Sequence, residues 1–144
     1  MNNSYLVAVD NSDGSKRALQ HAVERAKASS AKLILTHVID WSPYSFHTPD
    51  ELAERTKRRE EEIIRARDIV LVPLAEEVRQ AGLEVEIEIQ HGRGAETLAQ
   101  LAEQHNVAQI IAGRSGETNL KTLMFGSTSS KLVQISSVPV LIVP

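Results

Sequence analysis

Glycine and serine residues form two clusters in the stretch GRSGETNLKTLMFGSTSS, near the end of the sequence. Gly113 and Gly116 follow the apolar run VAQIIA, and Gly126 opens the second cluster with Ser127 and Thr128. A glycine lets a ligand approach the main chain because no Cβ stands in the way. A helix N-terminus adds unpaired N–H groups and positive partial charge, which suit phosphate oxygens. We interpret the clusters as an anion-binding site; the alternative is that Ser127 or Thr128 simply caps a helix.

The elements that must position these residues follow from the hydrophobic pattern, in which short apolar runs alternate with longer amphipathic ones. The expected strands are residues 5–10, 31–40, 83–91, 107–113 and 138–143. The expected helices are residues 12–30, 51–81, 96–106 and 126–136, the second kinked or broken at Pro73. Strands separated by helices pair in parallel through right-handed crossovers. We therefore predict an α/β fold, a five-stranded parallel sheet flanked by helices on both faces in a Rossmann-like open sandwich, as one domain over residues 1–144.

The two outer strands are expected from their side chains. Strict alternation in LEVEIEIQH places Leu83 and Ile87 on one face and Glu86 on the other, which is typical of a half-exposed edge strand. The last strand, Val138–Val143, is apolar and has no charged residue to protect an open edge. Pairing with the same strand of a second copy would cover it. We therefore expect a homodimer through Val138–Val143.

Composition excludes several classes of function. The chain has 144 residues, 42% hydrophobic and 24% charged, and contains no cysteine, so it forms neither disulfides nor thiolate metal sites. A net charge of −3 and only 3% aromatic residues argue against a nucleic-acid partner. No segment has the length of a membrane span and the N-terminus lacks a signal-peptide pattern, so we expect a cytoplasmic protein with no membrane insertion.

Other polar motifs predict less. The histidines show no metal-binding spacing. His37, near a strand end, could approach the pocket, but we favour a core histidine with satisfied hydrogen bonds. HGRGAET resembles a dinucleotide fingerprint but has Thr97 in place of the third glycine, so we interpret it as a turn and a helix start. Asp10 has two candidate roles, in the turn NSDG that begins the first helix and in a pocket at the end of the first strand.

Ligands of open α/β sheets bind beyond the carboxyl ends of the strands, where the two Gly/Ser clusters are expected to lie. The spacing Gly113-x-x-Gly116, nine residues, then Gly126-Ser127 resembles the nucleotide-binding signature of the universal stress protein family. VAVDNSDGSKRAL, HVID, HGRGAETLAQLAEQ, TNLKTLMFGSTSSKL and VPVLIV match that family in the same order. The resemblance covers essentially the whole chain.

The resemblance implies the ATP-binding branch of the family, with AMP or ADP as alternatives and Mg²⁺ or Mn²⁺ carried in by the nucleotide. Ala8 and Asp10 would lie at adenine and ribose, Val38 would meet the adenine through its main chain, and Gly113 would contact the ribose. Gly116, Gly126, Ser127 and Thr128 would contact the phosphates. The full implied nucleotide-binding set is Ala8, Val9, Asp10, Val38, Ala112, Gly113, Arg114, Ser115, Gly116, Gly126, Ser127 and Thr128. The resemblance also implies the homodimer through the last strand.

Three functions remain open from the sequence. The first is an ATP-binding homodimer that acts in stress response or regulation, with little or no catalysis. The second is a slow ATPase or nucleotidyl-transfer enzyme, for which Lys16, Arg114 and Lys121 are the only candidate catalytic cations. The third is a nucleotide-dependent regulatory subunit of a partner such as a transporter, contacted through the aromatic loop at Trp41–Pro49.

Overall fold

The sheet is built from five short strands. They are β1 (Ser4–Ala8), β2 (Lys32–Asp40), β3 (Val85–Gly92), β4 (Gln109–Gly113) and β5 (Val140–Val143). All neighbouring strands pair in parallel, in the order β3-β2-β1-β4-β5. The computed structural model describes residues 3–40, 48–115 and 126–144. The predicted five-stranded parallel sheet is confirmed, and β3 and β5 are its two edges.

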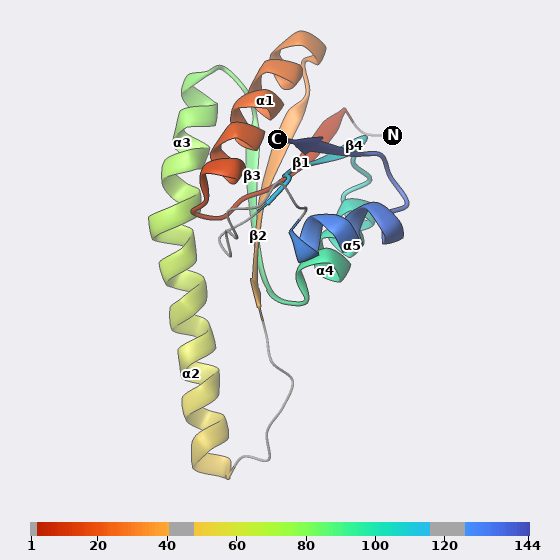
Figure 1. Ribbon diagram of the computed structural model, residues 1–144. Helices are drawn as coiled ribbons and strands as arrows, with labels where there is room; N and C mark the ends of the chain where they lie inside the picture. The colour runs from red at the N-terminus through yellow and green to blue at the C-terminus, as the bar shows by residue number, and fades with distance from the viewer. Residues whose placement is uncertain (1–2, 41–47, 116–125) are drawn as a thin grey trace.

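Helices cover both faces of this sheet (Figure 1). They are α1 (Asp13–Ser29), α2 (Pro49–Arg65), the π-helical segment η1 (Ala66–Leu71), α3 (Val72–Gln80), α4 (Gly94–Gln104) and α5 (Ser127–Ile135). Side chains of α1, η1 and α3 pack on one face, and those of α4 and α5 pack on the other. The fold is therefore the predicted Rossmann-like sandwich. In the described part of the chain, no helix is long and apolar enough to cross a membrane.

Pro73 does not break the helical run. In Figure 1, α2 and α3 form one long rod beside α1, and Pro73 lies in the first turn of α3. The N–H of Val72 donates to the carbonyl of Arg67, five residues earlier, which is the π-helical spacing. The helix therefore changes its hydrogen-bond spacing directly before Pro73, the residue that has no N–H to donate. The prediction of an interruption near Pro73 is confirmed only as a change of helical pitch, not as a break.

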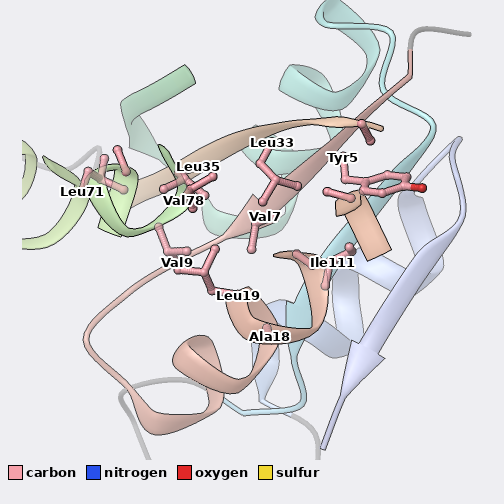
Figure 2. Close-up of a cluster of buried hydrophobic side chains, with 14 residues drawn as sticks. Tyr5, Val7, Val9, Ala18, Leu19, Leu33, Leu35, Leu71, Val78 and Ile111 are labelled. Carbon is pink, nitrogen blue, oxygen red and sulfur yellow. The ribbon is translucent and has the colours of Figure 1, made fainter. Parts of the chain in front are cut away.

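The core consists of two aliphatic layers, one on each side of the sheet. Successive residues of a strand point to opposite faces, so that Leu6 packs with α4 and α5 while Val7 packs with α1 and α3. Figure 2 shows the second of these layers, in which Val7, Leu33, Leu35 and Ile111 of the strands meet Leu19 of α1, with Val78 of α3 and Leu71 of η1 beside them. Aliphatic packing on both faces holds the strands in place. The candidate site lies at their carboxyl ends.

Charged side chains protect the β3 edge. Glu86 Oε1 lies 2.7 Å from Lys32 Nζ, and Glu88 Oε1 lies 3.0 Å from His105 Nε2. The hydrogen bond from Lys32 is the main cause that lowers the pKa of the Glu86 carboxyl below its ordinary value, and the nearby charges of Lys32 and His105 act in the same direction. Val85, Ile87 and Ile89 pack on the core instead. The predicted alternation of this strand is confirmed.

Candidate functional site

A hollow of about 260 Å³ opens at the carboxyl ends of β1, β2 and β4. In the sheet, β2 and β4 lie on opposite sides of β1, so the connections after β1 and β4 diverge at this point, as they do at ligand sites of open α/β sheets. The lining of the hollow consists mostly of small and hydroxyl-bearing residues: Ala8, Val9, Asp10, Ser12, Ser15, Thr36, His37, Val38, Asp40, Gly94, Leu98, Ala112, Gly113, Ser115, Gly126, Ser127, Thr128 and Ser129.

The N-terminus of α5 faces this hollow without a side-chain cap. Gly126 is the N-cap residue, and it has no side chain that could accept a hydrogen bond from the first turn. Its carbonyl accepts from Ser130, so the N–H groups of Ser127, Thr128 and Ser129 precede the first intrahelical bond. Capping by the Ser127 or Thr128 side chain, the alternative raised from the sequence, is not what the structure contains. The hollow therefore receives main-chain donors and the positive end of a helix dipole.

Two hydrogen bonds hold this helix end against the end of β4. The N–H of Gly126 donates to the carbonyl of Arg114 over 2.9 Å, and Ser129 Oγ donates to the carbonyl of Gly113 over 2.7 Å. Ser129 is buried, whereas Ser127 and Thr128 are exposed to the hollow. Ser129 thus fixes the position of the helix end, and its two neighbours leave their polar groups free to meet a ligand.

Gly113 also has a structural reason to lack a side chain. A Cβ on Gly113 would lie 2.9 Å from the carbonyl carbon and oxygen of Gly14, and a Cβ on Gly14 would lie 2.7 Å from the carbonyl oxygen of Ser115. These distances are shorter than Cβ contacts in real proteins. The sequence argument assigned Gly113 only to ligand approach. The structure adds close packing of the α1 start against the end of β4.

The turn between β1 and α1 supplies the polar wall opposite α5. Ser12 is the N-cap of α1 and accepts a hydrogen bond from the N–H of Ser15, whose Oγ accepts from the N–H of Asp10. The Asp10 carboxylate accepts from the N–H of Ser12 over 2.8 Å and from its hydroxyl. Both roles considered for Asp10 are therefore combined, because it organises the turn and also lines the hollow.

The end of β2 and the side of α4 complete the walls. Ala8, Val38, Leu98 and Ala112 belong to the hydrophobic layer beneath α4 and α5, and they form an apolar part of the hollow. His37 precedes Val38 in β2, and its Nδ1 lies 2.7 Å from the carbonyl oxygen of Val9. His37 has the hydrogen bond expected of a core histidine and also lines the hollow, so the two roles considered for it are combined.

Most of the residues implied by the sequence come together here. All of those that the structure describes line the hollow except Arg114, whose main chain instead bridges the Val143 carbonyl and Gly126. Gly116, Lys121 and the aromatic residues at 41–47 lie outside the described residues. Sequence reasoning missed Ser12, Ser15, Thr36, Asp40, Gly94, Leu98 and Ser129, and it considered His37 at the pocket only as the less favoured alternative. Ser12 and Ser15 could have been found from their position after the first strand. Gly94 and Leu98 line the hollow only because α4 packs against the sheet, which the sequence does not show.

The described residues offer little machinery for chemistry. Lys16 is exposed on α1, and neither it nor Arg114 lines the hollow. No group of three histidine, aspartate or glutamate side chains within residues 3–40, 48–115 and 126–144 could hold a metal ion. HGRGAET forms the end of β3 and the start of α4, as expected, with Arg93 as the N-cap residue. The described lining thus offers main-chain donors, hydroxyls and the two carboxylates of Asp10 and Asp40.

The chain belongs to the universal stress protein family, whose model matches residues 1–144. It is 33% identical to universal stress protein YxiE of Bacillus subtilis, with 99% of each chain covered. The solved UspA of Lactobacillus plantarum has a TM-score of 0.85 at 26% identity, over 100% of this chain and 99% of that one. A universal stress protein solved in complex with cAMP shares the fold, with a TM-score of 0.67 at 24% identity over 99% and 97% of the chains.

Proposed function

We propose that this universal stress protein binds an adenine nucleotide, ATP in the first place and AMP or ADP as alternatives, in the hollow at the strand ends. The observation that carries the proposal is the uncapped N-terminus of α5, which faces a cavity that also has an apolar part. Free first-turn amides and a helix dipole favour phosphate, and apolar lining favours a purine base. The cAMP complex of another member with this fold supports an adenine nucleotide.

The walls give the nucleotide an orientation. The phosphates would lie at Gly126, Ser127 and Thr128, where N–H and hydroxyl donors converge. The base would pack among the apolar side chains Ala8, Val38, Leu98 and Ala112. Asp10 and Asp40 would then lie on the side of the ribose, because carboxylates accept hydrogen bonds from hydroxyls and repel phosphates. Mg²⁺ or Mn²⁺ would arrive with the phosphates and screen their charge.

The β5 edge supports the proposed homodimer. The N–H of Ile110 donates to the carbonyl of Pro139, and that of Arg114 donates to the carbonyl of Val143. In a parallel pair, alternate residues turn their main-chain groups to the same neighbour. The main-chain groups of Val140 and Ile142 therefore point away from β4, where a second copy of β5 would pair with them. Such pairing would make a two-fold dimer.

Gly126→Asp tests the nucleotide proposal most sharply. Gly126 has φ −64° and ψ 158°, which any residue adopts, and Asp is a better N-cap than Gly by a few tenths of a kcal/mol. The variant should keep or slightly raise the thermal midpoint, yet weaken ATP binding at least tenfold, because its carboxylate occupies an amide and repels phosphate. Titration calorimetry with ATP measures the binding. Gly126→Asp protein that binds ATP as the wild type does would refute the proposed phosphate site.

A matched variant keeps the helix and removes the side-chain donors. Ser127→Ala and Thr128→Ala should each weaken ATP binding by about threefold, because each removes one hydroxyl while the main-chain amides remain. ATP turnover should stay low in all of these proteins, since neither Lys16 nor Arg114 lines the hollow. Turnover that falls in Lys16→Ala without a loss of affinity would favour the enzyme hypothesis instead.

A further inference from the structure

His37 has one engaged ring nitrogen and one nitrogen that has no hydrogen-bond partner in the described part of the chain. Nδ1 lies 2.7 Å from the carbonyl oxygen of Val9, and His37 is one of the residues that line the hollow. A carbonyl oxygen can only accept, so Nδ1 must carry the proton. The other nitrogen, Nε2, is then a hydrogen-bond acceptor in the neutral ring and a donor once the ring is protonated.

The position of His37 decides which half of the ligand it can meet. β2 and β4 lie on opposite sides of β1, so the end of β2 is about 10 Å from the end of β4 and farther from the phosphates proposed at α5. His37 follows Thr36 and precedes Val38, beside Val9 and Asp10 at the end of β1. These residues border the nucleoside part of the proposed ligand, which offers ribose hydroxyls and an exocyclic amino group as donors.

Several elements bring ionisable groups near His37. Asp10 and Asp40 line the same hollow. On the same sheet face, β3 contributes His91, whose Nε2 lies 3.2 Å from Glu62 Oε2 of α2. The charged side chains at the start of α1 and in η1 are exposed: Asp13, Lys16 and Arg17, and Arg67 and Asp68.

We propose that Nε2 of His37 accepts a hydrogen bond from the nucleoside half of the bound nucleotide, which makes His37 a specificity-determining residue whose contribution is lost on protonation. The proposal rests on the proposed function, because it needs a nucleotide in the hollow. Neutral His37 would select a ligand that carries a donor at this point. Below the pH at which the ring gains its second proton, the same contact becomes donor against donor, and affinity falls.

Two substitutions separate the nitrogens. His37→Asn places an amide nitrogen where Nδ1 lies, so the hydrogen bond to Val9 can persist, but it has no acceptor at the Nε2 position. His37→Gln reaches the Nε2 position with a neutral amide oxygen that does not titrate. At pH 8, calorimetry should show ATP and adenosine bound about three- to tenfold more weakly by the Asn variant and within about twofold of wild type by the Gln variant.

The pH profile distinguishes a ligand contact from a merely structural role. Between pH 8 and pH 5.5, wild-type affinity for adenosine, which has no phosphate to titrate, should fall by the same three- to tenfold factor. His37→Asn and His37→Gln should not show this fall. His21→Asn, on α1 outside the hollow, is the matched control and should follow the wild type. Thermal midpoints of all variants at each pH show whether the fold is intact.

Nucleotide analogues identify the donor. At pH 8, one of 2′-deoxy-ATP, 3′-deoxy-ATP and inosine triphosphate should bind wild-type protein more weakly than ATP does, and the His37→Asn variant should not discriminate against it. Equal ATP affinity of wild type and His37→Asn at pH 8, or superimposable adenosine profiles, would overturn the proposal while leaving the nucleotide site intact. Wild-type protein that binds no nucleotide at all would refute the proposed function itself.

Discussion

Gly113→Ala should destabilise the protein although it adds only one methyl group. The new Cβ would lie 2.9 Å from the carbonyl carbon and oxygen of Gly14, about half an ångström closer than an ordinary contact. Both sides of this contact are main chain, so no side chain can turn away. Overpacking of this kind costs about 1–3 kcal/mol, and the reduced freedom of the unfolded chain offsets about 0.4–1 kcal/mol. The free energy of unfolding should fall by about 1–2 kcal/mol.

Thermal and urea unfolding, followed by circular dichroism, measure this loss. For a chain of this length, about 1–2 kcal/mol corresponds to a thermal midpoint lowered by roughly 3–7 °C. Gly94→Ala is the matched control: its Cβ would lie 3.1 Å from Thr128 Oγ1, an exposed side chain that can rotate, so its midpoint should stay within about 2 °C of wild type. A Gly113→Ala protein as stable as Gly94→Ala would refute the close approach of Gly14 and Gly113.

The remaining predictions concern the helix end, the sheet edges and pH. Ser129→Ala should lower the free energy of unfolding by about 1–3 kcal/mol, because the buried hydroxyl no longer satisfies the Gly113 carbonyl; a denaturant midpoint equal to that of wild type would count against it. Ile142→Pro should give a monomer in light scattering with little loss of stability, because its N–H points away from β4, and a variant that stays dimeric would exclude the β5 interface. Lys32→Met should raise the pKa of Glu86 toward 4.5 in an NMR titration. Because the folded-state pKa of Glu86 is lowered, the wild type should be more stable than Lys32→Met at neutral pH, by less than about 1 kcal/mol. This stability difference should disappear as the pH falls through the lowered pKa. A difference that persists in acid would contradict the role of Lys32 in lowering the pKa of Glu86.

The sequence predicted the strands well because each one is a short aliphatic run whose burial pattern depends on local alternation. The β3 edge is an example, since Ile87 and Glu86 already reveal the buried and the exposed face. The effect of Pro73 on the long helical rod was harder to predict. Pro73 signals a helix break, but a π-helical turn just before it allows the helix to continue, and no local residue pattern announces such a turn.

The site was predicted where its residues follow a strand directly and missed where they arrive by packing. Gly113, Ser127 and Thr128 are visible in the sequence as small residues at a strand end and a helix start. Leu98 lines the hollow only because α4 packs against β2. Gly113 packs closely against Gly14, which is far away along the chain. Long-range contacts of this kind are set by tertiary packing and leave no spacing rule in the sequence.

Binding of an adenine nucleotide in the hollow is tested most directly by the ligand itself. Protein purified without added nucleotide is denatured, the released small molecules are identified by mass spectrometry, and the refolded or nucleotide-free protein is titrated with ATP and with GTP in a calorimeter. We expect ATP, ADP or AMP in the released fraction, and saturable heat with ATP at one site per chain that exceeds the heat with GTP. No released adenine nucleotide together with no saturable heat from ATP would contradict the proposed function.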